Sequence, residues 1–263
     1  MATSSSVTPP GGWPDVSAIL LDAGGVLVFP EPARVLPPLN AAGFHPDLAT
    51  LERAHYRAMA IQDAAVLPPV PDTWWRNYLL TYIASCGVPE DQCEVLAAEV
   101  HHGGYSWAHV GLGAIDGLLA VAALGLPMGV VSNSDGTVES DLRRLGICYA
   151  PPSATAPRST TASATAETET ELAGVPVGIV IDSAVVGVAK PDPAIFYLAL
   201  DALRVPPGRT VLHVGDSLRY DVAGALAAGL QPVHLDPYGF CPAPDGHPHI
   251  RSLADLPLLI GSR

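Results

Sequence analysis

The chain has few charged residues and almost no lysine. Of its 263 residues 15% are charged, and the 13 basic side chains are twelve arginines and one lysine, Lys190. The 26 acidic residues give a formal net charge of −13, and no cluster of lysine and arginine occurs. A nucleic-acid-binding surface needs concentrated positive charge. We therefore expect no nucleic-acid partner.

Long apolar runs are missing as well. Mean hydropathy is +0.30, yet no apolar run approaches the roughly 18 residues that a membrane-spanning helix requires. Residues 1–15 contain neither the basic residues nor the apolar stretch of a secretory signal. These absences predict a cytoplasmic protein that does not bind membranes.

Cysteine is scarce, and its spacing matches no zinc finger or redox motif. The four cysteines are Cys86, Cys93, Cys148 and Cys241. Without a CxxC pair they are interpreted as free thiols in a reducing compartment. The histidines at 101–102 and 247–249 are interpreted as surface or packing residues rather than metal ligands, because short histidine clusters seldom bind metal.

Short apolar runs alternate with helical patterns along much of the chain. The runs that predict strands are 17–22, 127–133, 177–182, 210–216 and 231–236, the last of these being the final strand. Helices are predicted between them at 115–124, 138–145, 194–203 and 222–228. Strands that are apolar throughout are buried on both faces. The alternation predicts an α/β fold with a Rossmann-like, doubly wound parallel sheet.

Residues 31–110 break this alternation. They contain several helical patterns and no clear strand, so they predict a helical domain inserted into a core formed by residues 16–30 and 111–263. Residues 1–15 are expected to be a flexible tail. Residues 150–174, rich in Ser, Thr, Ala and Pro, are expected to be a low-complexity loop within the core, because they have too few large apolar side chains to pack.

Polar residues stand where the predicted strands end. Asp22 follows the first strand, Ser132 and Asn133 end the second, and Asp216 ends the fourth. The lone Lys190 follows the third strand, just before Asp192-Pro193, which is a typical helix start. Carboxyl ends of parallel strands meet at one edge of a sheet. Two carboxylates, a hydroxyl and an ammonium group at that edge suit Mg²⁺ and a phosphoryl group.

Four segments resemble, in order, the signature motifs of the haloacid dehalogenase-like (HAD) hydrolase superfamily. They are LLDAGGVLV (20–28), VVSN (130–133), GVAKPDPAIF (187–196) and HVGDSLRYD (213–221). The resemblance covers roughly residues 16–148 and 175–240. The interval between the first two motifs resembles that of the subfamily with an α-helical cap domain.

This resemblance implies a catalytic role for Asp22, Ser132 and Lys190, and a phosphate-binding role for Ser132, Asn133 and Lys190. Asp22 is the expected nucleophile, forming an aspartyl-phosphate. Ser132 and Asn133 are expected to bind the phosphoryl oxygens. Lys190 is expected to pair with Asp22 and the phosphate, offsetting negative charge in the transition state.

The resemblance also implies a magnesium site. The expected ligands of Mg²⁺ are Asp22, the backbone carbonyl of Gly24 and Asp216, while Asp221 supports the ion through water. The expected partner of this site is a small phosphorylated metabolite. No feature of the sequence indicates an oligomeric state.

Gly24 departs from the pattern of the family's phosphatases, which carry a second aspartate two residues after the nucleophile. Glycine cannot transfer a proton, so three readings stay open. In the first, the protein is a phosphatase in which another group, or a substrate with a leaving group of low pKa, makes up for this aspartate. In the second it is a haloacid dehalogenase-type enzyme. In the third it binds a phosphorylated ligand without catalysis. Asp216 and Asp221 favour the Mg²⁺-dependent phosphatase. Unassigned candidates for substrate contact are His55, Tyr56, Arg57 and Trp107.

Overall fold

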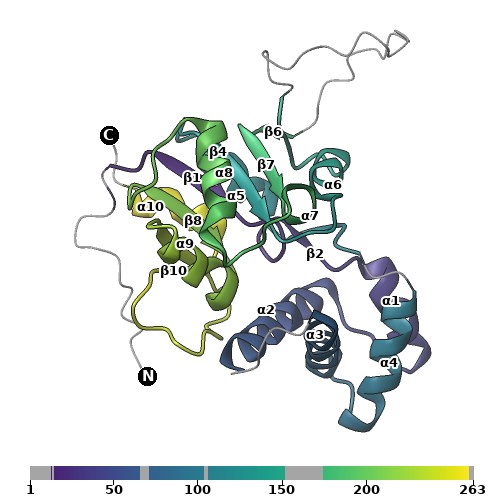
Figure 1. Ribbon diagram of the computed structural model, residues 1–263. Helices are drawn as coiled ribbons and strands as arrows, with labels where there is room; N and C mark the ends of the chain where they lie inside the picture. The colour runs from purple at the N-terminus through teal and green to yellow at the C-terminus, as the bar shows by residue number, and fades with distance from the viewer. Residues whose placement is uncertain (1–12, 14, 66–70, 104–105, 152–173, 261–263) are drawn as a thin grey trace, which may run out of the picture.

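A six-stranded sheet forms the centre of the computed structural model (Figure 1), with the strands in the order β10-β9-β8-β1-β4-β7. The structure describes residues 13, 15–65, 71–103, 106–151 and 174–260, without the side chains of 71–74. Most of the predicted tail and most of the predicted low-complexity loop therefore lie outside the described residues. At the end of the predicted tail, Trp13 is buried and its backbone N–H donates to the Leu259 carbonyl at 2.8 Å.

All strand pairs in this sheet are parallel. The strands are β1 (Ala18–Leu21), β4 (Met128–Ser132), β7 (Ile179–Asp182), β8 (Val211–Gly215), β9 (Gln231–Leu235) and β10 (His249–Ile250). The five predicted strands are confirmed to within two residues at each end. The prediction that 231–236 is the final strand is wrong, because β10 extends the edge beyond β9. At two residues, β10 is too short to show a periodic pattern.

Helices cover the sheet between the strands. They are α5 (Ala114–Ala122), α6 (Val138–Arg144), α7 (Ser183–Val186), α8 (Pro193–Leu203), α9 (Ala223–Ala227) and α10 (Leu256–Leu259), with a 3₁₀ turn, η2 (Leu253–Asp255). The helix predicted at 222–228 begins earlier, with a π-helical turn, η1 (Leu218–Val222), that runs into α9. Ser217 caps η1 by accepting a hydrogen bond from the Tyr220 N–H.

Both faces of β1 are buried. Ile19 and Leu21 pack on one side in the cluster that contains Leu118 of α5. Ala18 and Leu20 pack on the other side with Phe196 of α8. Side chains alternate across a strand, so this division requires helices on both faces. The predicted doubly wound α/β class is confirmed.

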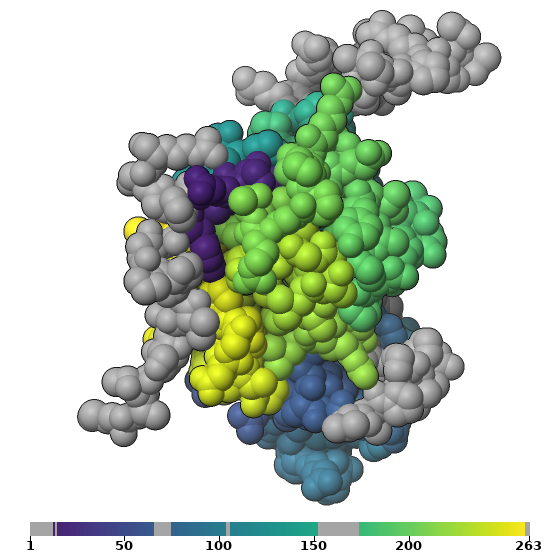
Figure 2. Space-filling view, turned by 60° about the vertical axis from the view of Figure 1, so that its left-hand side comes forward, coloured from purple at the N-terminus to yellow at the C-terminus, as the bar shows by residue number. Residues whose placement is uncertain are grey.

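A four-helix insertion interrupts the core after β1. It consists of α1 (Pro32–Ala41), α2 (Leu48–Ala64), α3 (Pro71–Ser85) and α4 (Glu90–His102). Its helices share a hydrophobic cluster of their own, which includes Leu39, Leu51, Tyr82 and Leu96. In Figure 2 its blue surface lies against the green and yellow surface of the core.

Short two-stranded ribbons mark two junctions of the chain. β2 (Val28–Phe29) pairs antiparallel with β3 (His109–Val110) where the chain leaves and re-enters the core. β5 (Cys148–Tyr149) pairs in parallel with β6 (Val175–Pro176). β3 falls within the span 31–110, for which no strand was predicted; like β10, it is too short to show alternation. Within the described residues, no helix is both long enough and apolar enough to cross a membrane.

Candidate active site

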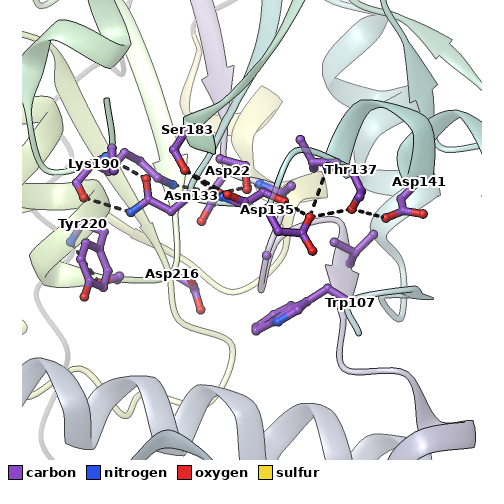
Figure 3. Close-up of a pocket in the computed structure, with 18 of the residues that line it drawn as sticks. Asp22, Trp107, Asn133, Asp135, Thr137, Asp141, Ser183, Lys190, Asp216 and Tyr220 are labelled. Atoms are coloured by element: carbon purple, nitrogen blue, oxygen red, sulfur yellow. Dashed lines mark hydrogen bonds and ion pairs between the residues drawn. The ribbon is translucent and has the colours of Figure 1, made fainter. Parts of the chain in front are cut away.

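A pocket of about 850 Å³ opens at the carboxyl ends of the central strands, between the core and the helical insertion. All seven residues predicted for the site line it: Asp22, Gly24, Ser132, Asn133, Lys190, Asp216 and Asp221. Figure 3 shows Asp22, Asn133 and Lys190 on the side of the core and Trp107 nearer the helices of the insertion. The fold therefore brings together residues that are up to 199 positions apart, from 22 to 221.

The Lys190 ammonium group lies between two carboxylates. Its Nζ is 2.8 Å from Asp22 Oδ1 and 2.7 Å from Asp221 Oδ1, and the side chain is 1% exposed. Burial by itself lowers the pKa of Lys190, but the two carboxylates outweigh it and raise that pKa to about 12. Burial opposes ionisation of Asp221 too, yet Lys190 and His213 hold its pKa below the usual range. Lys190 and Asp221 thus form a charged buried pair.

The negative charge of Asp22 is offset less fully by its neighbours than the charge of Asp221 is. The Ala23 N–H donates to its Oδ1 at 2.7 Å. Burial, with repulsion from Asp221 and Asp216, raises the pKa of Asp22 to about 7, although Lys190 acts in the opposite direction. Three carboxylates here share one ammonium group. The local charge therefore favours a further cation.

The three carboxylates are placed to hold such a cation. Oxygen atoms of Asp22, Asp216 and Asp221 lie within 4.8 Å of one another. An all-oxygen carboxylate set is the kind that Mg²⁺ prefers. Asp221 also accepts hydrogen bonds from His213 Nε2 at 2.8 Å and from the Ser217 N–H at 3.1 Å. These contacts are compatible with the predicted supporting role of Asp221, which stays a prediction.

Asn133 holds the loop that carries Lys190. Its amide group donates to the Lys190 carbonyl at 2.9 Å and accepts from the Lys190 N–H at 2.8 Å. These two hydrogen bonds tie the end of β4 to the lysine loop. Ser132, at the end of β4, is buried and lines the pocket. The predicted contacts of Ser132 and Asn133 with phosphate stay predictions.

Asp182 is a residue that the sequence reasoning missed. It ends β7, and its carboxylate accepts from the N–H groups of Gly136, Val138 and Ala184 at 2.9–3.3 Å. It thereby orders the loop that follows β4 on one wall of the pocket. A signal was present, because Asp182 ends an apolar run in the same way as Asp22 does.

The insertion reaches the site through α2. His55 is 1% exposed; its Nε2 lies 2.7 Å from Asp216 Oδ2 and its Nδ1 lies 2.8 Å from the Tyr78 hydroxyl. The neighbouring Tyr56 donates its hydroxyl to the Gly25 carbonyl at 2.7 Å. Both were unassigned candidates for substrate contact in the sequence. In the structure His55 binds the predicted metal ligand Asp216, and Tyr56 binds the loop that follows the predicted nucleophile Asp22.

The carboxylate of Asp63, also on α2, binds the start of η1. It accepts from Ser217 Oγ at 2.9 Å, the Leu218 N–H at 2.7 Å and the Arg219 N–H at 3.2 Å. Burial raises the pKa of Asp63 to about 6, and these hydrogen bonds oppose the rise. The local sequence around Asp63 contains no signal of this contact, because its partners are more than 150 residues away.

The fold, the motifs and the comparisons agree on one family. The family model described as haloacid dehalogenase-like hydrolase matches residues 16–229. The chain belongs to the haloacid dehalogenase-like hydrolase family. It is 29% identical over 162 residues to haloacid dehalogenase-like hydrolase domain-containing protein 3 of Danio rerio, covering 60% of this chain and 55% of that protein.

Shorter matches to HAD phosphatases also occur. N-acylneuraminate-9-phosphatase of Rattus norvegicus is 42% identical over 77 residues, which is 28% of this chain and 31% of that protein. This HAD chain therefore spans about half or less of the length of these curated relatives.

Solved HAD structures share the fold. A HAD phosphatase from Thermococcus onnurineus superposes with a TM-score of 0.51 at 19% identity, over 94% of this chain and 100% of that one. The putative HAD-hydrolase YfnB from Bacillus subtilis, described as bound to magnesium, gives 0.52 at 15% identity over 93% and 98%. At these identities the likeness shows the fold alone.

One position in this HAD site is unusual in its packing. A Cβ atom on Gly24 would lie 3.3 Å from Cζ3 and 3.5 Å from Cε3 of Trp107. Most real Cβ contacts are longer. The place where the second aspartate of HAD phosphatases would begin is therefore beside the indole ring. Trp107 thus occupies the space beside Gly24 into which such a side chain would extend.

Proposed function

We propose that the protein is a Mg²⁺-dependent phosphatase that acts on a small phosphorylated metabolite through an aspartyl-phosphate at Asp22. The observation that carries this proposal is the buried Asp22–Lys190–Asp221 arrangement, with Asp216 beside it, at the base of a pocket. A volume of about 850 Å³ is in the range of small-molecule sites. The phosphatase names of some relatives support the same reaction class.

In the first step an Asp22 carboxylate oxygen bonds to phosphorus, the bond from phosphorus to the leaving alcohol breaks, and the alcohol oxygen takes a proton from water. In the second step a water oxygen bonds to phosphorus, the bond from phosphorus to the Asp22 oxygen breaks, and a proton passes to the solvent. Inorganic phosphate leaves and the Asp22 carboxylate is restored. The Lys190 ammonium group offsets charge on the phosphoryl oxygens, and the Ser132 hydroxyl donates to one of them. Asp22, Asp216 and the Gly24 carbonyl, with Asp221 in support, would hold Mg²⁺, which would reduce the repulsion between the Asp22 carboxylate and the phosphate.

We further propose that the four-helix insertion is a cap that selects the substrate. This assignment is supported by the lining of the pocket, to which the insertion contributes His55, Met59 and Trp75, and the segment after α4 contributes Trp107. Closure of such a cap keeps bulk water from the reacting groups.

The absence of a carboxylate at position 24 should affect how turnover depends on the leaving group. General acid catalysis assists leaving groups that are poor when unprotonated, by roughly 10²–10⁴-fold. Without a donor at Gly24, we expect turnover to fall steeply as the pKa of the leaving alcohol rises.

The test is hydrolysis of aryl and alkyl phosphates of graded leaving-group pKa, followed by phosphate release. We expect activity with Mg²⁺, none after chelation by EDTA, and none in Asp22→Asn. The matched control is Asp192→Asn, because Asp192 is an exposed cap of α8 and asparagine caps equally well. Unchanged turnover in EDTA or in Asp22→Asn would contradict the proposal.

A haloacid dehalogenase-type reaction is the second candidate, favoured by the Gly24–Trp107 packing, because that chemistry needs no second carboxylate. There Asp22 displaces halide from carbon, and water attacks the Asp22 carbonyl carbon of the resulting ester. A single turnover in ¹⁸O-labelled water separates the two reactions, since the label enters Asp22 in a dehalogenase and inorganic phosphate in a phosphatase. Stabilisation by a sugar phosphate with no turnover of either substrate would support the non-catalytic binder.

A further inference from the structure

A second group of potential metal ligands lies at the β9–β10 edge of the sheet. It consists of His234, Cys241, His247 and His249, each of which offers one ligand atom within 4.8 Å of the others. Its nitrogen and sulfur donors differ from the carboxylate oxygens of the candidate active site. We refer to these four residues as the His–Cys cluster.

Backbone pairing brings the cluster together. β10 runs parallel to β9 with His249 in register with His234. The His234 N–H donates to the Pro248 carbonyl at 2.8 Å. In the intervening loop the Asp236 carboxylate accepts from the N–H groups of Phe240 and Cys241 at 2.8 and 3.0 Å. This turn returns Cys241 to the ends of the two strands.

The spacing of the donor atoms matches a tetrahedral zinc site. Zinc bonds of about 2.1 Å to nitrogen and 2.3 Å to sulfur place two nitrogens about 3.4 Å apart, and nitrogen and sulfur about 3.6 Å apart. His234 Nδ1 lies 3.2 Å from His247 Nε2, and Cys241 Sγ lies 3.7 Å from the same nitrogen. These two edges of the tetrahedron are already formed.

In His234 and His249 one ring nitrogen is used in a hydrogen bond to the backbone, which leaves the other nitrogen with a lone pair for a metal ion. His234 Nε2 lies 3.0 Å from the Asp216 carbonyl, which can only accept, so Nε2 carries the proton and Nδ1 carries a lone pair. The His249 ring hydrogen-bonds the backbone of His247. Its Nε2 is buried and has no hydrogen-bond partner among the described residues. Metal-binding histidines typically donate their other N–H to a carbonyl in this way.

The environment disfavours a second proton on the His247 and His249 rings, and it keeps the Cys241 thiol protonated until a metal ion replaces the proton. His234 and His247 are buried. Burial, followed by the neighbouring histidines, lowers the pKa of His247 to about 4. Burial raises the pKa of the Cys241 thiol to about 11. Neutral imidazoles bind a metal directly, and a metal ion is the partner that stabilises a buried thiolate.

We propose that the His–Cys cluster binds one Zn²⁺ ion with four protein ligands. Three imidazoles and a thiolate are a borderline-soft set that suits zinc, and four protein ligands leave no open position, which is typical of a structural site. The ion joins β9, β10 and the loop between them. Through the hydrogen bond from His234 to the Asp216 carbonyl, it also braces the loop that carries Asp216. The inference is independent of the proposed phosphatase function.

The test is titration of the metal-free, reduced full-length chain with Zn²⁺ alone, followed by metal analysis after desalting. We expect one tightly held zinc per chain. Cys241→Ser and His247→Ala should each weaken zinc binding by about 100-fold or more, since even second-shell changes weaken metal sites by 10–100-fold. The matched control, Cys86→Ser, removes another half-buried cysteine and should retain the zinc.

Cobalt substitution of the unaltered chain tests the thiolate ligand without relying on a variant that folds. Co²⁺ bound to Cys241 gives a sulfur-to-cobalt charge-transfer band, which Cys86→Ser should keep. Absence of that band, or of retained zinc, would overturn the proposal. Loss of zinc in Asp216→Asn but not in Cys241→Ser would place the metal at the carboxylates and also overturn it.

Discussion

The indole ring of Trp107 packs against the backbone of Gly24, with Cζ3 only 3.3 Å from the position of a Cβ atom. The two residues are separated by the entire four-helix insertion. The contact joins Gly24, where HAD phosphatases carry a second aspartate, to an aromatic residue of the segment that follows the insertion. An aspartate at position 24 would place its Cβ atom against the indole ring, so Trp107 must shift by a few tenths of an ångström to admit it.

Gly24→Asp should destabilise the chain by about 1–3 kcal/mol, because the added side chain must displace the indole ring. Trp107→Phe makes room, so the double variant should be more stable than the sum of the two changes predicts, by about 1 kcal/mol. Urea denaturation of the four chains measures this coupling. Additive effects would show that the two side chains do not compete for the same space.

The same double variant should gain activity on poor leaving groups. With a carboxylate restored and room for it, turnover of an alkyl phosphate should rise at least tenfold over Gly24→Asp alone, since general acid help is worth about 10²–10⁴-fold. The ratio of alkyl to aryl phosphate turnover measures the effect. An unchanged ratio would mean that another group already supplies the proton.

Removing the Lys190 charge should affect stability as well as turnover. Lys190→Met leaves Asp22 and Asp221 buried without their cation, and breaking a buried pair in this way costs about 3–5 kcal/mol. Lys190→Arg should not restore activity, because a guanidinium group is larger and planar. The control is Arg76→Met, which breaks the exposed pair with Glu94 and should cost less than about 1 kcal/mol. Equal losses in the two Met variants would contradict this account.

Asp63 should hold the loop after Asp216 in place from the side of the insertion. In Asp63→Ala the amide protons of Leu218 and Arg219 lose their acceptor, so their hydrogen exchange should accelerate about tenfold or more. Asp47→Ala is the matched control, because Asp47 caps the other end of α2 and accepts from the Thr50 N–H. Unaltered exchange at 218–219 in Asp63→Ala would rule out this bracing role.

The raised pKa of Asp63 also predicts that the stability of the chain depends on pH. Its pKa rises from 3.8 to about 6 on folding, so the folded chain holds this proton more tightly than the unfolded chain. The resulting stabilisation is complete below pH about 4 and is lost as the pH rises through about 6. Compared with Asp63→Asn, the free energy of unfolding of the unaltered chain should therefore fall across this interval. Parallel pH profiles for the two chains would be the opposite result.

Much of the fold was predictable because its signals are local. Buried parallel strands are continuous apolar runs, and five of them were located to within two residues. The two-residue strands β2, β3, β5, β6 and β10 were missed, since two residues carry no periodicity. The π-helical turn η1 before α9 was also missed, and its first residues are hydrogen-bonded to Asp63, more than 150 positions away.

The sequence by itself determined which groups stand at the strand ends, and therefore that Asp22, Ser132, Lys190 and Asp216 meet at one edge. That result follows from parallel topology, which aligns the carboxyl ends of all its strands. Only the tertiary structure decided that His55 binds Asp216, that Trp107 lies over Gly24, and that three histidines gather around Cys241. These contacts depend on how separate units pack in three dimensions, and no local pattern of residues encodes that packing.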